Sequence, residues 1–210
     1  MHRLLFSITL ATILSVPARL PADTAPLEPA ADQPAAEPRA LFSTGSRLVY
    51  TVSGGKVLVV DIVDYPRRDG PVAFRFQFSR LGPEGTVTLT SAALREATAL
   101  HNYFEHGAVT LADRTSVWLS QKVFAAAKAG EPVTLDLGPD GTATFTLDPE
   151  GGGFLPLSID PLRYGNLGAI GTLLLRSADG KTIRVHDDAD SPLIVEMDTG
   201  SFTVGLALHL

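Results

Sequence analysis

The sequence contains no cysteine among its 210 residues. Disulfides, cysteine nucleophiles, thiolate metal sites and a lipid-modified N-terminal cysteine are therefore excluded, and stability must come from a packed core. An excess of positive charge is also missing, because 17 Lys and Arg stand against 23 Asp and Glu, for a net charge of −6. Such a chain is a poor partner for nucleic acid, since phosphate binding needs a basic surface.

Long apolar runs are scarce too, and the most prominent one opens the chain. Residues 4–16 form a thirteen-residue, mainly apolar run behind a cationic start that contains Arg3. A membrane-spanning helix needs about 20 apolar residues, so this run fits the core of a secretory signal instead. Val16-Pro17-Ala18 then suits a signal peptidase. We therefore expect a signal peptide over residues 1–18, export to the periplasm or the medium, and no transmembrane segment after its removal.

The segment after the signal differs in composition from the rest of the chain. Residues 19–40 carry prolines at positions 21, 26, 29, 34 and 38 among alanines and acidic residues. Proline resists helix formation and removes backbone donors, so we expect an extended linker, either a spacer or a tail without a role. Residues 41–210 are long enough for one substantial core and are predicted to form a single domain.

The predicted domain shows mainly a period of two. Apolar Phe74, Phe76 and Phe78 alternate with polar residues, and similar alternation recurs up to the C-terminus. Alternation places every second side chain on one face, which is typical of half-buried strands. Turn-forming sequences at 53–55, 139–141 and 178–180 predict hairpins. The fold class is therefore mainly β: an antiparallel sheet that is curved or forms a barrel or half-barrel. Residues 56–65 are more continuously apolar and are predicted to be buried on both faces.

Two segments show helical spacing instead. Residues 91–105 carry Leu94, Leu100 and Phe104 on one predicted face, with Ser91 as the expected N-cap. Residues 120–129 form the second predicted helix, and Gly130 is placed to end it.

One motif points to enzymatic chemistry. A strand-like run leads into Asp198-Thr199-Gly200-Ser201, which resembles the catalytic loop of aspartic peptidases. In that family two aspartates share a proton and activate water, so the resemblance implies a hydrolase that uses Asp198 in a dimer. Only nine residues follow Ser201, which is too few for the flap and strands of that fold. A hairpin turn is the favoured interpretation, and the prediction is that the protein is not an enzyme.

Two further clusters of residues are candidates for metal binding. Asp187, Asp188 and Asp190 could supply oxygen ligands to calcium, although their spacing does not match the twelve-residue calcium loop, and a solvated loop is the alternative. His101 and His106 are five residues apart, whereas zinc-binding helices place histidines four apart. The sequence predicts no cofactor.

The aromatic stripe offers the best candidate for ligand binding. In a β domain, Phe74, Phe76 and Phe78 either fill a packed core or line a cavity for an apolar ligand. Both interpretations stay open from the sequence.

A phrase between the two predicted helices carries a family resemblance. Thr115-Ser116-Val117-Trp118-Leu119-Ser120, followed by Lys128 and Gly130, resembles secreted bacterial β-rich proteins of unknown function. The architecture also resembles periplasmic half-barrels of the lipoprotein-carrier kind, which implies a curved sheet that holds acyl chains against a helical plug. Neither resemblance implies a catalytic residue. The sequence therefore predicts an exported, non-enzymatic envelope or extracellular domain that binds a hydrophobic ligand or a partner protein, or serves as a scaffold.

Overall fold

β-Strands make up most of the chain that the computed structural model describes, which is residues 42–66, 70–79, 81–156, 158–159 and 169–209. These residues all lie in one compact unit, Ala40–Leu210. The predicted signal peptide (1–18) and linker (19–40) lie outside them. The strands are β1 (Arg47–Val52), β2 (Lys56–Asp64), β3 (Val72–Phe78), β4 (Glu84–Leu89), β5 (Gly107–Leu111), β6 (Val133–Asp136), β7 (Thr142–Pro156), β8 (Ser158–Ile159), β9 (Ala169–Ser177), β10 (Thr182–His186), β11 (Ile194–Asp198) and β12 (Thr203–His209), and the helices are α1 (Ser91–Glu96), α2 (Gln121–Lys128) and the short 3₁₀ turn η1 (Gly138–Asp140).

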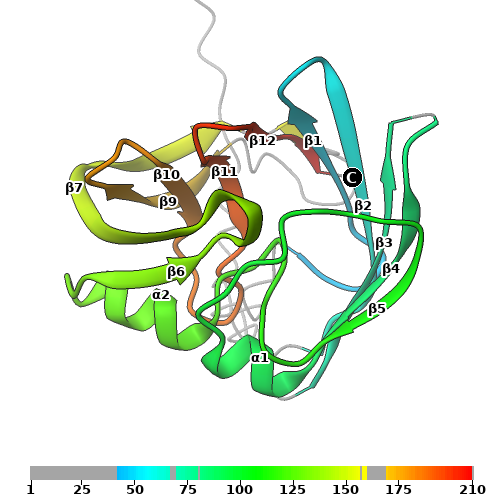
Figure 1. Ribbon diagram of the computed structural model, residues 1–210, viewed down its shortest axis with the longest axis horizontal. Coiled ribbons are helices and arrows are strands. Elements are labelled where there is room, and N and C mark those ends of the chain that lie inside the picture. Colours follow the sequence, from blue (N-terminus) through cyan, green and yellow to red (C-terminus); the bar gives the residue numbers. More distant parts are fainter. Residues whose placement is uncertain (1–41, 67–69, 80, 157, 160–168, 210) are drawn as a thin grey trace, which may run out of the picture. The chain divides into compact units, whose positions relative to one another are not determined.

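All strands belong to one open sheet. Its order is β5-β4-β3-β2-β1-β12-β11-β10-β9-β7-β6, and β8 pairs with β12 off this path. The pairs are antiparallel except β4–β5 and β8–β12. In Figure 1 the strands β1–β5 stand on one side, β6, β7, β9 and β10 on the other, and β11 and β12 between them, so the sheet is strongly curved. The predicted mainly β fold is confirmed; the sheet does not close into a barrel.

Local turn chemistry accounts for the predicted hairpins. Gly54 and Gly55 both have positive φ, 77° and 71°, in the tight turn that joins β1 to β2. Glycine adopts this backbone without a steric penalty, so the turn can follow the twist of its strands. The turns before Gly141 and Gly180 join β6 to β7 and β9 to β10 in the same antiparallel manner. All three predicted hairpins are confirmed.

The burial of β2 differs from the prediction. Leu58, Val60 and Ile62 are buried, whereas Val57 and Val63 are 37% and 43% exposed. The strand therefore buries one face only, and the prediction of two buried faces was wrong. An apolar run of β-branched residues cannot distinguish these cases, because valine also suits an exposed strand position.

The first helix is shorter than its spacing predicted. α1 ends at Glu96, not at residue 105, and Thr90 is its N-cap instead of Ser91. Beyond it, the backbone N–H of Leu100 donates to the carbonyl of Asp136 at 2.8 Å. Partners from β6 thus replace the helical hydrogen bonds, and no local pattern records partners that are so distant in the sequence.

The second helix agrees with its prediction. The hydroxyl of Ser120, the N-cap of α2, accepts a hydrogen bond from the backbone N–H of Val123 at 3.2 Å. Gly130 follows the helix with a φ of 81°, the left-handed conformation in which helices commonly end. No helix in the described ranges is long and apolar enough to cross a membrane.

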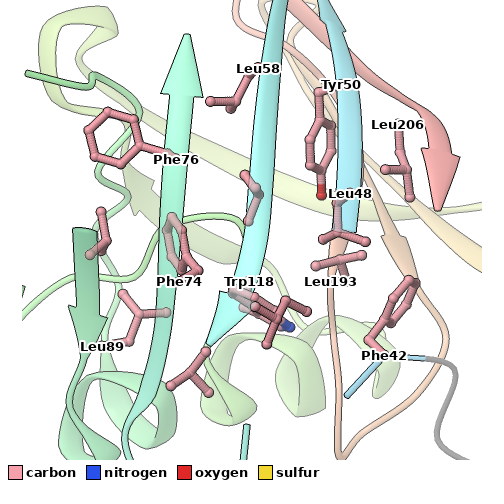
Figure 2. Close-up of a cluster of buried hydrophobic side chains, with 14 of the residues drawn as sticks. Phe42, Leu48, Tyr50, Leu58, Phe74, Phe76, Leu89, Trp118, Leu193 and Leu206 are labelled. Atoms are coloured by element: carbon pink, nitrogen blue, oxygen red, sulfur yellow. The ribbon is translucent and has the colours of Figure 1, made fainter. Parts of the chain in front are cut away.

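Two clusters of apolar side chains form the core. The first lies mainly on β1–β4 and includes Trp118, which stands between Phe74 and Leu193 in Figure 2. The second lies on α2, β6, β7, β9, β10 and β11 and includes Phe124 and Phe145. The connection between the helices contacts both halves of the sheet, since the ring of Trp118 lies 5.8 Å from that of Phe74 on β3 and Ala99 bridges to Asp136 on β6.

Candidate functional site

A cavity of about 320 Å³ lies between the sheet and the connection that joins α1 to α2. Its residues come from three parts of the chain. The lining is Tyr50, Val52, Ser53, Lys56, Leu58 and Phe78 from β1–β3; Leu100, His101, Asn102, Phe104, Ser116 and Val117 from the connection; and Ile194, Met197, Ser201, Phe202 and Val204 from β11, β12 and their turn.

The cavity is located where the two core clusters meet. Tyr50 and Leu58 belong to the first cluster, Leu100 and Ile194 belong to the second, and Val204 packs against both. Protein interiors are otherwise close-packed, with few voids larger than a water molecule. The space is a pocket that opens to solvent beside exposed residues such as Ser53 and Lys56, and it lies at the junction of the two clusters.

The lining is graded from an exposed mouth to a buried end. Ser53, Lys56 and Ser201 are exposed and define the mouth, whereas His101 and Ser116 are 7% and 2% exposed. Of the described lining residues, Lys56 carries a positive charge and none is Asp or Glu. Its ammonium lies 5.8 Å from the ring centre of Phe78, which is a cation–π distance.

Two buried polar atoms of the lining have no hydrogen-bond partner among the described residues: Nδ1 of His101 and Oγ of Ser116. The backbone places them together, because His101 N–H donates to the carbonyl of Thr115 at 2.7 Å and Leu100 pairs with Thr115 in a parallel bridge. In a parallel pairing both chains advance together, so residue 101 lies beside residue 116. Buried polar atoms are nearly always paired, so a water molecule or a polar group of a ligand is expected to pair with these two atoms.

The protonation of His101 follows from its surroundings. Burial lowers the pKa of this imidazole, the positive charge of Arg114 lowers it further, and Glu105 opposes them. The ring is therefore neutral near pH 7, with one nitrogen donating and the other accepting. Its ring centre lies 4.2 Å from that of Tyr103, a contact that restrains its position.

The hydroxyl of Tyr50 is satisfied, in contrast to these two atoms. It donates a hydrogen bond to the carbonyl of Ile194 at 2.9 Å, and burial raises its pKa. Tyr50 therefore contributes an apolar ring to the cavity and a cross-sheet hydrogen bond to the fold.

The structure separates the three phenylalanines that the sequence grouped as a ligand-binding stripe. Phe78 is half-buried and lines the cavity. Phe74 is fully buried 5.8 Å from Trp118, and Phe76 is 4% exposed and 4.8 Å from Phe104, both measured between ring centres. Two members of the stripe thus lie in the packed core, and a ligand-binding role stays a prediction for Phe78.

The acidic segment 187–190 is placed away from the cavity lining. Asp187 accepts from the ammonium of Lys128 at 2.5 Å, and Asp188 accepts from the backbone N–H of Asp190 at 2.9 Å. In the part of the chain that the structure describes, no three acidic or histidine side chains are grouped so that they could hold a metal ion. The calcium hypothesis for Asp187, Asp188 and Asp190, and the zinc hypothesis for His101 and His106, have no geometric support there.

The Asp-Thr-Gly-Ser motif forms a turn between strands. Asp198 pairs with Thr203 across β11 and β12, and its carboxylate accepts from the backbone N–H of Gly200 at 2.8 Å. Gly200 has a φ of 86°, which this tight reversal requires. The interpretation of the motif as a hairpin turn is confirmed, and the carboxylate of Asp198 stabilises that turn.

Sequence reasoning missed most of this cavity. Lys56 and Asn102 carry no motif, Ser116 lies in the phrase 115–120 whose family resemblance implies no role for it, and the sequence suggests only zinc binding for His101. The available signal was the placement of polar residues within a largely apolar connection. Comparison of the chain with protein-family models, with curated proteins and with solved structures gives no match.

Proposed function

We propose that this protein is an exported, non-enzymatic binding protein whose cavity takes up a small amphipathic molecule. The observation that carries the proposal is a largely apolar cavity of about 320 Å³ in which two buried polar atoms, His101 Nδ1 and Ser116 Oγ, lack a partner. Ligand sites typically measure about 300–1,000 Å³ and combine apolar walls with a few placed polar groups.

Each part of the lining has a role in this proposal. Burial of an apolar body against residues such as Leu58 and Ile194 supplies affinity, because apolar surface leaves water. The unpartnered atoms of His101 and Ser116 supply orientation, because a ligand group that pairs with them removes the cost of leaving them unpaired.

The same geometry supports binding in preference to nucleophilic catalysis. A serine nucleophile is activated by a hydrogen bond to its base and by a third group that orients the base. His101 Nδ1 and Ser116 Oγ form no such bond with each other or with any other described residue.

Uptake of the neutral fluorescent probe N-phenyl-1-naphthylamine tests the proposal. We expect saturable binding to the purified protein and its loss in Val204→Trp, because a larger side chain fills the cavity. Val52→Trp, on the neighbouring strand, serves as a second filling variant, since Val52 pairs with Val204 and also lines the cavity. Val63→Trp is the matched control, because Val63 is 43% exposed and outside the lining. Absence of saturable uptake by the unchanged protein would contradict the proposal.

Export is tested separately by sequencing the N-terminus of the protein recovered outside the cytosol. We expect the chain to start at Arg19, because the apolar run 4–16 and Ala18 form the predicted signal and cleavage site. An intact Met1 on cytosolic protein would contradict export and leave the binding proposal in place.

A further inference from the structure

The charge at the mouth of the cavity differs from that of the whole chain. The chain has a net charge of −6, yet among the residues that the structure describes the lining contains one Lys or Arg, Lys56, and no carboxylate. Lys56 makes no ion pair with the residues that the structure describes, and its ammonium lies over the Phe78 ring. An anionic group that arrives at this mouth therefore meets an unpaired cation. The carboxylate of Asp140 lies outside the described lining, and its oxygens accept hydrogen bonds from Ser201 and Asn102 of the lining.

The buried end of the cavity offers two neutral polar atoms instead of a charged group. His101 and Ser116 are 7% and 2% exposed, and neither Nδ1 nor Oγ has a partner among the described residues. A serine hydroxyl donates and accepts, and Nδ1 of a neutral imidazole donates or accepts according to its tautomer. A hydroxyl on the ligand can satisfy both atoms in either tautomer, whereas a methyl group can satisfy neither.

The wall between these two ends is apolar. Leu58, Ile194 and Val204 lie in the lining beside the ring of Tyr50, whose hydroxyl is already bonded to a backbone carbonyl. A chain that runs from the mouth to the buried end thus meets hydrocarbon along the way.

From these three observations we infer that the ligand is an aliphatic acid with a second polar group, a hydroxyl, along or at the end of its chain. The carboxylate lies at Lys56, the hydrocarbon lies against the apolar wall, and the hydroxyl bonds to His101 and Ser116. This inference rests on the proposed binding function and adds the chemical class of the ligand.

Displacement of N-phenyl-1-naphthylamine by four ten-carbon compounds tests the inference. The compounds are 10-hydroxydecanoate, decanoate, 1,10-decanediol and 1-decanol. The first two carry a carboxylate with and without a distal hydroxyl, and the last two carry no carboxylate and two hydroxyls or one. We expect 10-hydroxydecanoate to bind at least about tenfold more tightly than decanoate, since decanoate leaves the buried pair unsatisfied.

Variants of this chain assign each end of the ligand. Lys56→Gln should lower the affinity for both carboxylate compounds about tenfold and leave the affinity for the diol unchanged, because only the carboxylates carry a charge for Lys56 to bind. Ser116→Ala and His101→Phe should remove the preference for 10-hydroxydecanoate over decanoate. Lys122→Gln and His106→Gln are the matched controls, because both side chains are exposed and outside the lining.

The outcomes separate this inference from the function on which it rests. Equal affinity for decanoate and 10-hydroxydecanoate would overturn the inference, as would unchanged carboxylate binding in Lys56→Gln, while probe uptake would still support a binding function. Failure of the unchanged protein to take up the probe would overturn both.

Discussion

At the scale of the residue, Phe74, Phe76 and Phe78 show how one strand serves two purposes. Their spacing places all three on one face of β3. The surroundings of that face change along the strand: Trp118 lies against Phe74, Phe104 lies against Phe76, and Phe78 lines the cavity. The same residue type is therefore a core residue at one position and a cavity wall four positions later.

This difference predicts unequal effects of truncation. Phe74→Ala should lower the free energy of unfolding by about 3–5 kcal/mol, the usual cost of deleting a fully buried aromatic side chain. Phe78→Ala should cost less, because Phe78 is half-buried, and it should weaken probe uptake. Urea denaturation measures both stability losses. The two values can be compared if the free energy of unfolding falls with urea concentration at the same slope in both variants and in the unchanged protein. Similar stability losses in the two variants would contradict the assignment.

The buried imidazole predicts a pH dependence of stability. Burial and Arg114 lower the pKa of His101 in the folded protein, whereas an unfolded histidine titrates near about 6.5. As the pH falls through about 6.5, the unfolded chain gains a proton that the folded chain resists, so stability decreases toward acid. In His101→Gln the free energy of unfolding, measured by urea denaturation, should decrease less steeply between about pH 7.5 and 5.5. An equally steep decrease in His101→Gln and in the unchanged protein would refute the assignment.

At the scale of the element, local signals succeeded where the partners were local. The caps of α2 and the glycines of the β1–β2 turn act on neighbouring atoms, and both elements formed as predicted. The segment after α1 was mispredicted because Leu100 bonds to Asp136, 36 positions away. The exposure of Val57 and Val63 likewise depended on which side of β2 the rest of the chain covered.

The attachment of the edge strand β5 depends on a pair of glycines. Gly85 of β4 pairs with Gly107 of β5, and a Cβ atom added at Gly85 would lie 1.8 Å from the backbone oxygen of Gly107. Gly85→Ala should therefore push β5 off β4 and cost about 1–3 kcal/mol or more, as for other overpacked sites.

Urea denaturation with hydrogen exchange of residues 107–111 measures this effect. We expect a lower free energy of unfolding and faster exchange in β5. Gly171→Ala is the matched control in β9, because a Cβ there meets nothing within 4 Å. Equal stability of the two alanine variants would show that β5 does not need the close approach.

At the scale of the whole described unit, the sheet holds two core clusters with a cavity at their junction. Tyr50 and Leu58 of the first cluster and Leu100 and Ile194 of the second all line this cavity. A ligand that fills it would therefore contact residues of both clusters.

A ligand at this junction should stabilise the protein as a whole. With free probe at 100 times its dissociation constant, the free energy of unfolding should rise by about 2.7 kcal/mol if the probe binds only the folded state. Thermal and urea denaturation with and without N-phenyl-1-naphthylamine measure the shift. Val204→Trp, which fills the cavity, should show no shift; an equal shift in this variant would place the probe elsewhere on the protein.

The sequence alone determined the mainly β class, three hairpins and the second helix, because alternation, turn glycines and helix caps act over a few residues. The sequence also predicted that Asp198-Thr199-Gly200-Ser201 forms a turn between strands. Only the tertiary structure decided which face of β2 is buried, where α1 ends, and which phenylalanine lines the cavity. The cavity itself combines Lys56, His101, Ser116 and Val204. These residues are distant in sequence, and they meet only because the open, curved sheet packs against the connection between α1 and α2. No local pattern could therefore have predicted the site.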